Sequence, residues 1–267
     1  MLIDTHAHLT DARYAADADQ VIADAAAQGV ERCLTIATGL EDAVRAVALA
    51  RRHPSRLGVA IGIDPHSAHV AADRAMVLAG LEAAIAAARD CVAAVGEFGF
   101  EWHHRYGEAP EQEAWADAQL SLARRLDLPV VLHARSGRGR DAHRDMLAAL
   151  DRHPGVRGVI HSFDGDAPTA GAYAARGLHI AINGMATFKA NAALRAALPA
   201  IPEDRLLLET DSPYLSPEPL RGRRNQPSHL HHILAVAARE RGVAPQRLAA
   251  ATTANALRLF AVPGWRP

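Results

Sequence analysis

One pattern recurs along the whole chain and limits the folds that it can adopt. A short run of β-branched and other apolar residues is followed by a turn and then by an amphipathic segment rich in Ala, Leu and Arg. This alternation is typical of parallel strands joined by crossover helices. The pattern predicts eight strands: Leu2–His6, Arg32–Thr38, Leu57–Ile63, Val92–Phe98, Pro129–His133, Gly158–Ser162, Leu178–Asn183 and Arg205–Thr210.

Amphipathic segments of helical length lie between these strands and after the last one. The predicted helices are Ala18–Gln28, Glu41–His53, Arg74–Asp90, Glu111–Leu126, Ala142–His153, Ala167–Ala175, Ala190–Leu198, Ser228–Arg241 and Pro245–Phe260. Eight strands, each followed by helix, close naturally into a (β/α)8 barrel, or TIM barrel. The chain of 267 residues fits one such barrel, and no linker rich in Pro, Gly or Ser interrupts it. We therefore expect a single domain over residues 1–267.

Charge and hydropathy exclude several classes of protein. The formal net charge is only -1 at pH 7, so no overall basic field is available to hold long duplex nucleic acid. No apolar run approaches the roughly 20 residues of a membrane span, and the N-terminus lacks the features of a signal peptide. Cys33 and Cys91 lie in apolar runs without metal-motif spacing. We expect a cytoplasmic protein with reduced thiols and no membrane partner; the oligomeric state stays open, with a monomer favoured.

Ionisable residues stand at the ends of five predicted strands. Such a residue at the tip of an apolar strand is costly to bury unless it is paired or coordinated, and in a barrel these ends meet on the face that carries active sites. The longest irregular stretches, Phe100–Pro110, Arg135–Arg140 and Tyr214–Pro227, follow strands at the same face. The strand-end residues are His6, His8, Glu97, His133, His161 and Asp211.

Four histidines and two carboxylates are more ligands than one tetrahedral metal site uses. Their number therefore favours two divalent metal ions. Nitrogen and carboxylate donors suit Zn²⁺, Mn²⁺ or similar ions, so we expect Mg, Mn or Zn. Glu97 could bridge both ions, and Asp211 could bind one of them and take a proton from the attacking water. We therefore predict Glu97 and Asp211 as catalytic residues. Two divalent cations against two carboxylates leave a positive pocket that suits an anionic phosphodiester.

With these residues in view, the sequence resembles the TatD family of metal-dependent deoxyribonucleases, among the amidohydrolase-like TIM barrels. The anchors of the resemblance are Asp4-Thr5-His6-Ala7-His8-Leu9, Gly96-Glu97-Phe98-Gly99, Pro129 to Arg135, His161-Ser162-Phe163-Asp164-Gly165 and Glu209 to Leu215. The resemblance implies that His6, His8, Glu97 and Asp211 hold one metal, and that Glu97, His133 and His161 hold the other. It also implies hydrolysis of DNA ends, mainly single-stranded and from the 3′ side, with Mg²⁺ or related ions.

Four positions depart from the family pattern. They are Asp64, in Gly62-Ile63-Asp64-Pro65-His66, then Glu101, Ser162, and Gln226, in Asn225-Gln226-Pro227. We expect these departures to leave the six metal ligands untouched and to alter substrate recognition, with Asp64 adding a negative charge.

Four residues form the predicted substrate-binding set. Arg135 follows a ligand by two positions and could bind a phosphate. Tyr214, like Trp102, is predicted on a rim loop, where its ring could stack on an unpaired base. His66 and Asn225 lie in two of the divergent motifs and complete the set.

Three other functions compete with a nuclease. An amidohydrolase-type ester, amide or lactone hydrolase could use the same site, although many of those enzymes bridge their metals with a carbamylated lysine, and the only lysine here is Lys189, after the seventh strand. An aminoacyl-tRNA deacylase-type activity would also use a metal-activated water. A non-catalytic, metal-stabilised scaffold is the third alternative.

Overall fold

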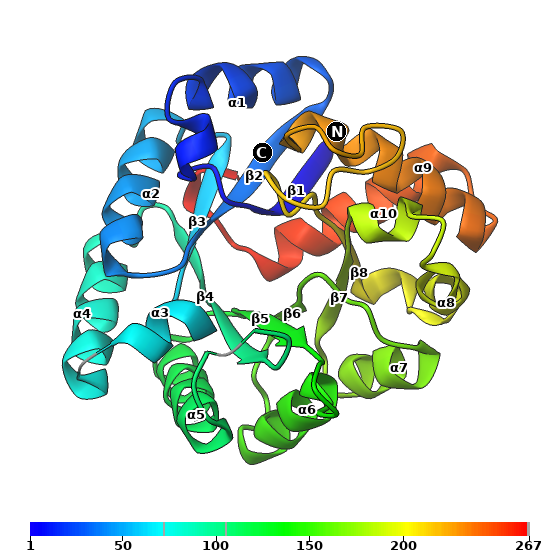
Figure 1. The fold of residues 1–267 in the computed structure, drawn as a ribbon. Helices are drawn as coiled ribbons and strands as arrows, with labels where there is room; N and C mark the ends of the chain where they lie inside the picture. Colours follow the sequence, from blue (N-terminus) through cyan, green and yellow to red (C-terminus); the bar gives the residue numbers. More distant parts are fainter. Residues whose placement is uncertain (72, 105, 266–267) are drawn as a thin grey trace.

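The structure is a computed structural model that describes residues 1–71, 73–104 and 106–265. Its eight parallel strands lie in one sheet in the order of the sequence, from β1 to β8. The helices surround the strands in the same order (Figure 1). The predicted (β/α)8 barrel is therefore confirmed. The strands are β1 (Leu2–Ala7), β2 (Val30–Ala37), β3 (Leu57–Ile61), β4 (Val92–Glu101), β5 (Val130–Arg135), β6 (Gly158–Ile160), β7 (His179–Ile182) and β8 (Leu206–Leu208).

The helices largely follow the predicted amphipathic segments. They are α1 (Ala18–Ala27), α2 (Leu40–Arg52), α3 (Pro65–Val70), α4 (Arg74–Ala87), α5 (Ala109–Leu126), α6 (Ala142–Arg152), α7 (Ala167–Ala175), α8 (Ala192–Ala197), α9 (Leu230–Arg241) and α10 (Pro245–Leu259). Aspartates begin several of them: the side chain of Asp73 accepts a hydrogen bond from the Met76 amide at the start of α4, and Asp141 accepts one from Arg144 at the start of α6. None of the helices among these described residues has the length and apolar character of a membrane span.

Several elements differ from the prediction; β6 and β8, for example, end before the predicted Ser162 and Thr210. Two differences bear on the site. Helix α3 was not predicted, since six residues are too few for a helical pattern; the Asp64 side chain begins it by accepting a hydrogen bond from the Ser67 amide, with Pro65 in its first turn. Strand β4 continues past Phe98, because Phe100 and Glu101 pair with the end of β5. The start of the predicted irregular stretch Phe100–Pro110 is therefore strand.

The core has two layers, one on each side of the barrel wall. The larger layer packs the helices against the strands, and the smaller one fills the barrel with apolar side chains that include Ile3, Leu34 and Val131. The inner layer also contains Phe260 and Trp265, which follow helix α10. The end of the described chain therefore forms a floor under the barrel, at the end of the strands opposite the irregular loops.

The barrel closes between β1 and β8 through scattered contacts instead of a regular ladder. In the described part of the chain no ladder joins this pair, and an isolated bridge links Ala7, at the end of β1, to Ser212, beyond the end of β8. The Asp4 carboxylate accepts hydrogen bonds from the Thr210 amide at 2.9 Å and the Thr210 hydroxyl at 2.6 Å. Burial raises the pKa of Asp4 to about 7, although these hydrogen bonds act in the opposite direction. Asp4 thus joins the first and last strands directly beneath the site described next.

Candidate metal centre

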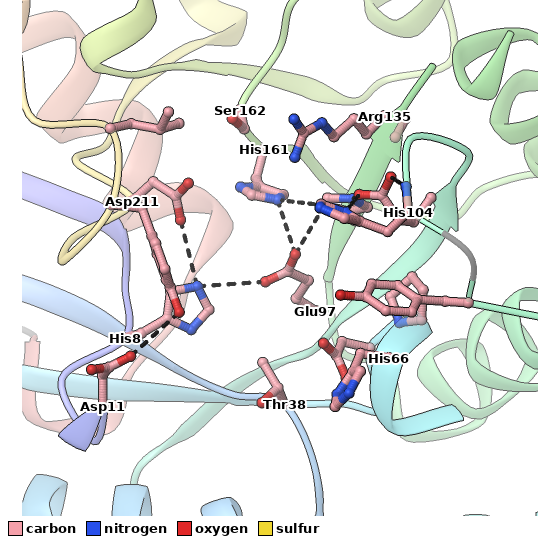
Figure 2. A pocket seen from close by; sticks show the side chains of 18 of the residues that line it. His8, Asp11, Thr38, His66, Glu97, His104, Arg135, His161, Ser162 and Asp211 are labelled. Atoms are coloured by element: carbon pink, nitrogen blue, oxygen red, sulfur yellow. Dashed lines mark hydrogen bonds and ion pairs between the residues drawn. The ribbon is translucent and has the colours of Figure 1, made fainter. Parts of the chain in front are cut away.

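All six predicted metal ligands meet at the carboxyl ends of the strands, and all but the buried His6 line a cavity of about 800 Å³. Figure 2 shows the side chains of His8, Glu97, His161 and Asp211 turned toward one another in this cavity. The sequence placed them far apart, and the barrel brings them together because parallel strands end on one face.

The first group consists of His6, His8, Glu97 and Asp211. The Nε2 atoms of His6 and His8 are 3.3 Å apart, because both side chains leave the same face of the end of β1. Glu97 Oε2 lies 3.3 Å from His6 Nε2 and 3.8 Å from His8 Nε2. Asp211 Oδ1 lies 3.6 Å and 3.4 Å from the same two nitrogens. The four donor atoms therefore surround a position where one metal ion could bind.

The second group consists of Glu97, His133 and His161, whose donor atoms form a nearly equilateral triangle. Glu97 Oε1 lies 3.0 Å from His133 Nδ1 and 3.1 Å from His161 Nε2. The two nitrogens are 3.1 Å apart. Glu97 thus gives one oxygen to each group and is positioned to bridge them.

The spacing of the second group fits one divalent metal ion, and in the first group two carboxylate-to-nitrogen distances, 3.6 Å and 3.8 Å, are slightly wider than the ideal spacing. Ligands that each lie about 2.1 Å from one ion are roughly 3.0–3.4 Å apart in octahedral or tetrahedral geometry. Burial would raise the pKa of Glu97, but His161, His133 and His6 outweigh it and hold that pKa well below its usual range. The bridging position therefore carries a negative charge, as a metal site requires.

Glu101 is a functional residue that the sequence did not assign to the metal site. Its Oε2 atom lies 3.2 Å from His133 Nε2, and its Oε1 atom accepts hydrogen bonds from the His103 and His104 amides. The expectation that none of the four departures touches a metal ligand is thus wrong for Glu101. Glu101 is four positions after Glu97 on β4, a spacing that puts both on one face of a strand and could have identified it. A Cβ at Gly99, between them, would lie 2.0 Å from the His133 carbonyl oxygen, so β5 packs this closely only against glycine.

His161 also has a carboxylate behind it, at a longer distance. Glu209 is buried, and its Oε1 atom lies 3.5 Å from His161 Nδ1 and accepts a hydrogen bond from the Ser162 amide at 2.6 Å. A carboxylate behind a ligating imidazole orients the ring and makes it a stronger ligand. The sequence feature that could have identified Glu209 is its position directly after an apolar run, two residues before Asp211.

Three of the four predicted substrate-binding residues, Arg135, His66 and Tyr214, line the cavity. The Tyr214 ring is held in place by the Arg13 guanidinium, 4.2 Å from its centre, and by a 3.3 Å hydrogen bond from its hydroxyl to Asp11. The side chain is 46% exposed, so one part of a rigid ring stays open to a ligand.

Asn225 and Trp102 lie elsewhere than predicted. Asn225 is fully buried, and its side-chain amide donates hydrogen bonds to the carbonyls of Thr210 and Tyr214. It therefore holds the loop after Asp211 in place and does not line the cavity. Trp102 is buried as well and donates a hydrogen bond from Nε1 to Asp145. The polar group of each side chain is therefore used in a hydrogen bond inside the protein. The position of a residue in the sequence does not reveal such a bond.

Replacing Glu101 with glutamine is expected to weaken metal binding by about 10- to 100-fold, because His133 loses the negative charge that makes it a strong ligand. Isothermal titration of the metal-free protein with Mn²⁺ measures the change. Glu82→Gln, at an exposed glutamate that pairs with Arg125, is the matched control. Equal affinities for the Glu101 variant and the wild type would show that Glu101 does not support the ligand.

Metal affinity is expected to increase with pH between about 7 and 9. Burial alone would lower the pKa of His133, but hydrogen bonds to Glu101 and Glu97 outweigh it and raise that pKa to about 9. Below that pH the metal-free ring holds a proton that an ion must displace, so binding releases protons and is weaker at lower pH. Titrations with Mn²⁺ in buffers of different ionisation enthalpy measure the proton release. Binding without proton release would contradict the expectation.

The barrel and the two donor groups at its carboxyl end define a TIM-barrel protein with a candidate centre for divalent metal ions. The chain belongs to the TatD family: residues 3–261 match the family described as TatD related DNase. The predicted resemblance is thereby confirmed.

Individual relatives agree over nearly their whole length. The chain is 41% identical to the 3′-5′ ssDNA/RNA exonuclease TatD of Cronobacter sakazakii, over 97% of each protein. It is 37% identical to the enzyme of the same name from Escherichia coli K12, over 98% of this chain and 99% of that protein. The crystal structure of a TatD homologue from E. coli, YJJV, superimposes with a TM-score of 0.89 at 30% identity, covering 98% of both chains. A TatD family hydrolase from Entamoeba histolytica has the same fold, with a TM-score of 0.88 at 20% identity.

Proposed function

We propose that the protein is a metal-dependent 3′–5′ exonuclease that shortens single-stranded DNA or RNA from its end. The observation that carries this proposal is the bridging position of Glu97 between two groups of donor atoms at the bottom of an open cavity. Membership of the TatD family and the names of the two exonuclease relatives support the choice of substrate. We further propose that residues 1–267 act as one domain, since α10 packs against both β1 and β8.

Different residues would bind the metal ions, accept a proton and orient the ligands in the proposed reaction. Divalent ions (Mg, Mn or Zn) held by the six ligands would acidify water and neutralise negative charge on the phosphodiester. Burial would raise the pKa of Asp211, but hydrogen bonding to His8 and the nearby His6 outweigh it and lower that pKa. Asp211 is therefore ionised at neutral pH and is the base that takes a proton from the attacking water. Glu101 and Glu209 keep His133 and His161 oriented.

Arg135 is the residue best placed to bind a substrate phosphate. It ends β5, is exposed and lines the cavity, and no ion pair holds its guanidinium among the residues that the structure describes. Replacing Arg135 with alanine is expected to raise the KM for a short oligonucleotide about 10-fold with a smaller change in kcat, since a phosphate contact is lost. Initial rates over a range of oligonucleotide concentrations measure this. Arg144→Ala, at an exposed position outside the cavity, is the control, and an equal KM for both variants would exclude Arg135 from substrate binding.

A gel assay tests the proposed function. Purified protein is incubated with 5′-labelled single-stranded and duplex DNA and with single-stranded RNA, in Mg²⁺, Mn²⁺, Zn²⁺ or EDTA. We expect a ladder of shortened single strands that keep the 5′ label, and no products in EDTA. Intact substrate with every metal would refute the nuclease, and hydrolysis of ester or lactone substrates by the same preparation would establish the competing amidohydrolase function.

A further inference from the structure

The cavity has more carboxylates than its metal groups use. Asp11 and Asp42 pair with Arg13 and Arg45, and Glu101 lies against His133, which belongs to the second metal group. Asp64 accepts a hydrogen bond from the Ser67 amide at the start of α3. Asp164, in the loop between β6 and α7, lines the cavity without an arginine or lysine partner among the described residues.

Asp164 is held in place from behind by a buried histidine. Its Oδ1 atom lies 2.8 Å from Nε2 of His143 on α6, and the other ring nitrogen of His143 lies 3.1 Å from the Tyr173 hydroxyl on α7. Phe163 packs against the His143 ring, 5.4 Å between ring centres. The Asp164 side chain itself is 43% exposed. A rigid network thus presents a carboxylate to the cavity.

The hydrogen bonds in this network fix the orientation of the carboxylate. Burial raises the pKa of Tyr173 well above its usual range, so its hydroxyl keeps its proton and can donate it to His143 Nδ1. Both ring nitrogens of His143 thus have a partner, Tyr173 on one side and Asp164 on the other. Asp164 is therefore held in one orientation through its Oδ1 atom, and no arginine or lysine among the described residues pairs with it.

We propose that Asp164 selects strands that end in a free 3′-hydroxyl group; this inference rests on the proposed exonuclease function. A fixed carboxylate accepts a hydrogen bond from a hydroxyl and repels a phosphate. Along a nucleic acid strand the 3′ oxygen carries a phosphate everywhere except at the terminus. A carboxylate facing the terminal sugar thus distinguishes an end from the interior, and an ordinary end from a 3′-phosphorylated one.

The test compares three 5′-labelled DNA oligonucleotides of one sequence, ending in a 3′-hydroxyl, a 3′-hydrogen or a 3′-phosphate. For the wild type we expect the 3′-hydroxyl strand to be cleaved roughly 10-fold faster than the 3′-hydrogen strand and at least about 100-fold faster than the 3′-phosphate strand. Asp164→Asn has the same shape without the charge. It should cleave the 3′-hydroxyl strand, which proves that it is folded, and should lose most of the discrimination against 3′-phosphate. Asp166→Asn, two residues away at the start of α7 and outside the cavity, should behave like the wild type.

The outcomes separate this inference from the proposed function. A wild type that cleaves no strand refutes the exonuclease and this inference with it. A wild type that cleaves strands while Asp164→Asn keeps full discrimination against 3′-phosphate refutes only the role of Asp164. A change in preference for the terminal base, with the hydroxyl-to-phosphate ratio unchanged, also overturns the proposal and assigns Asp164 to the base.

Discussion

Replacing Glu97 with glutamine is expected to reduce strand cleavage at least about 1000-fold and to lower the metal content from about two ions per chain to one or none. Glu97 gives Oε2 to the first group of donors and Oε1 to the second, so one substitution weakens both. An amide has a single oxygen and no negative charge, and the four histidines then lack the anion between them. Elemental analysis of dialysed protein and single-turnover cleavage rates measure the two effects.

Glu113→Gln is the matched control for this experiment, because Glu113 is an exposed residue of α5 outside the cavity. It should retain both metal and activity. A Glu97→Gln variant that keeps two ions and at least a tenth of the wild-type rate would refute the bridging role and, with it, the assignment of the two groups as one centre.

Replacing Asp211 with asparagine is expected to lower kcat at least about 1000-fold while KM changes only a few-fold. The amide oxygen can still face His8 and His6, where Asp211 Oδ1 now lies, so much of the site keeps its geometry. The amide cannot accept a proton from water, however, and the chemical step should fail. Steady-state kinetics at pH 7 and pH 9 measure the effect. Asp204→Asn, at an exposed aspartate, is the control, and substantial turnover by the Asp211 variant would assign the base to another residue.

The ends of the strands made most of the site predictable from the sequence. An apolar strand that ends in a histidine or carboxylate is informative, because burial of such a group needs a partner. His133, His161 and Asp211 each follow such a run. Because the parallel strands of a barrel all end on one face, these residues must lie close together. Several patterns that are weak one by one therefore predict a single metal centre.

The residues that were missed or misplaced depend on contacts that the sequence does not contain. Glu101 reaches His133 only because β4 extends to pair with the end of β5. Asn225 was expected to bind substrate, but its amide satisfies two carbonyl groups inside the loop. In both cases the partner of the polar side chain is set by how the chain folds back, between two strands for Glu101 and within one loop for Asn225.

The position of Lys189 also bears on the competing functions. This only lysine is exposed and does not line the cavity. A carbamylated lysine therefore has no place between the two groups of donors, and Glu97 occupies the bridging position instead.

The floor under the barrel has a consequence for how the protein is made. Phe260 and Trp265 fill the inner core, and Thr253 on α10 donates a hydrogen bond to the Met1 carbonyl. During synthesis β1 therefore has one open edge and an uncovered inner face until β8 and the α10 segment have been made. We expect ribosome-bound chains that lack the α10 segment to stay sensitive to proteolysis, and chains in which that segment has left the ribosome to become resistant. The same strand carries His6 and His8, so the metal centre would be completed in the final step of folding.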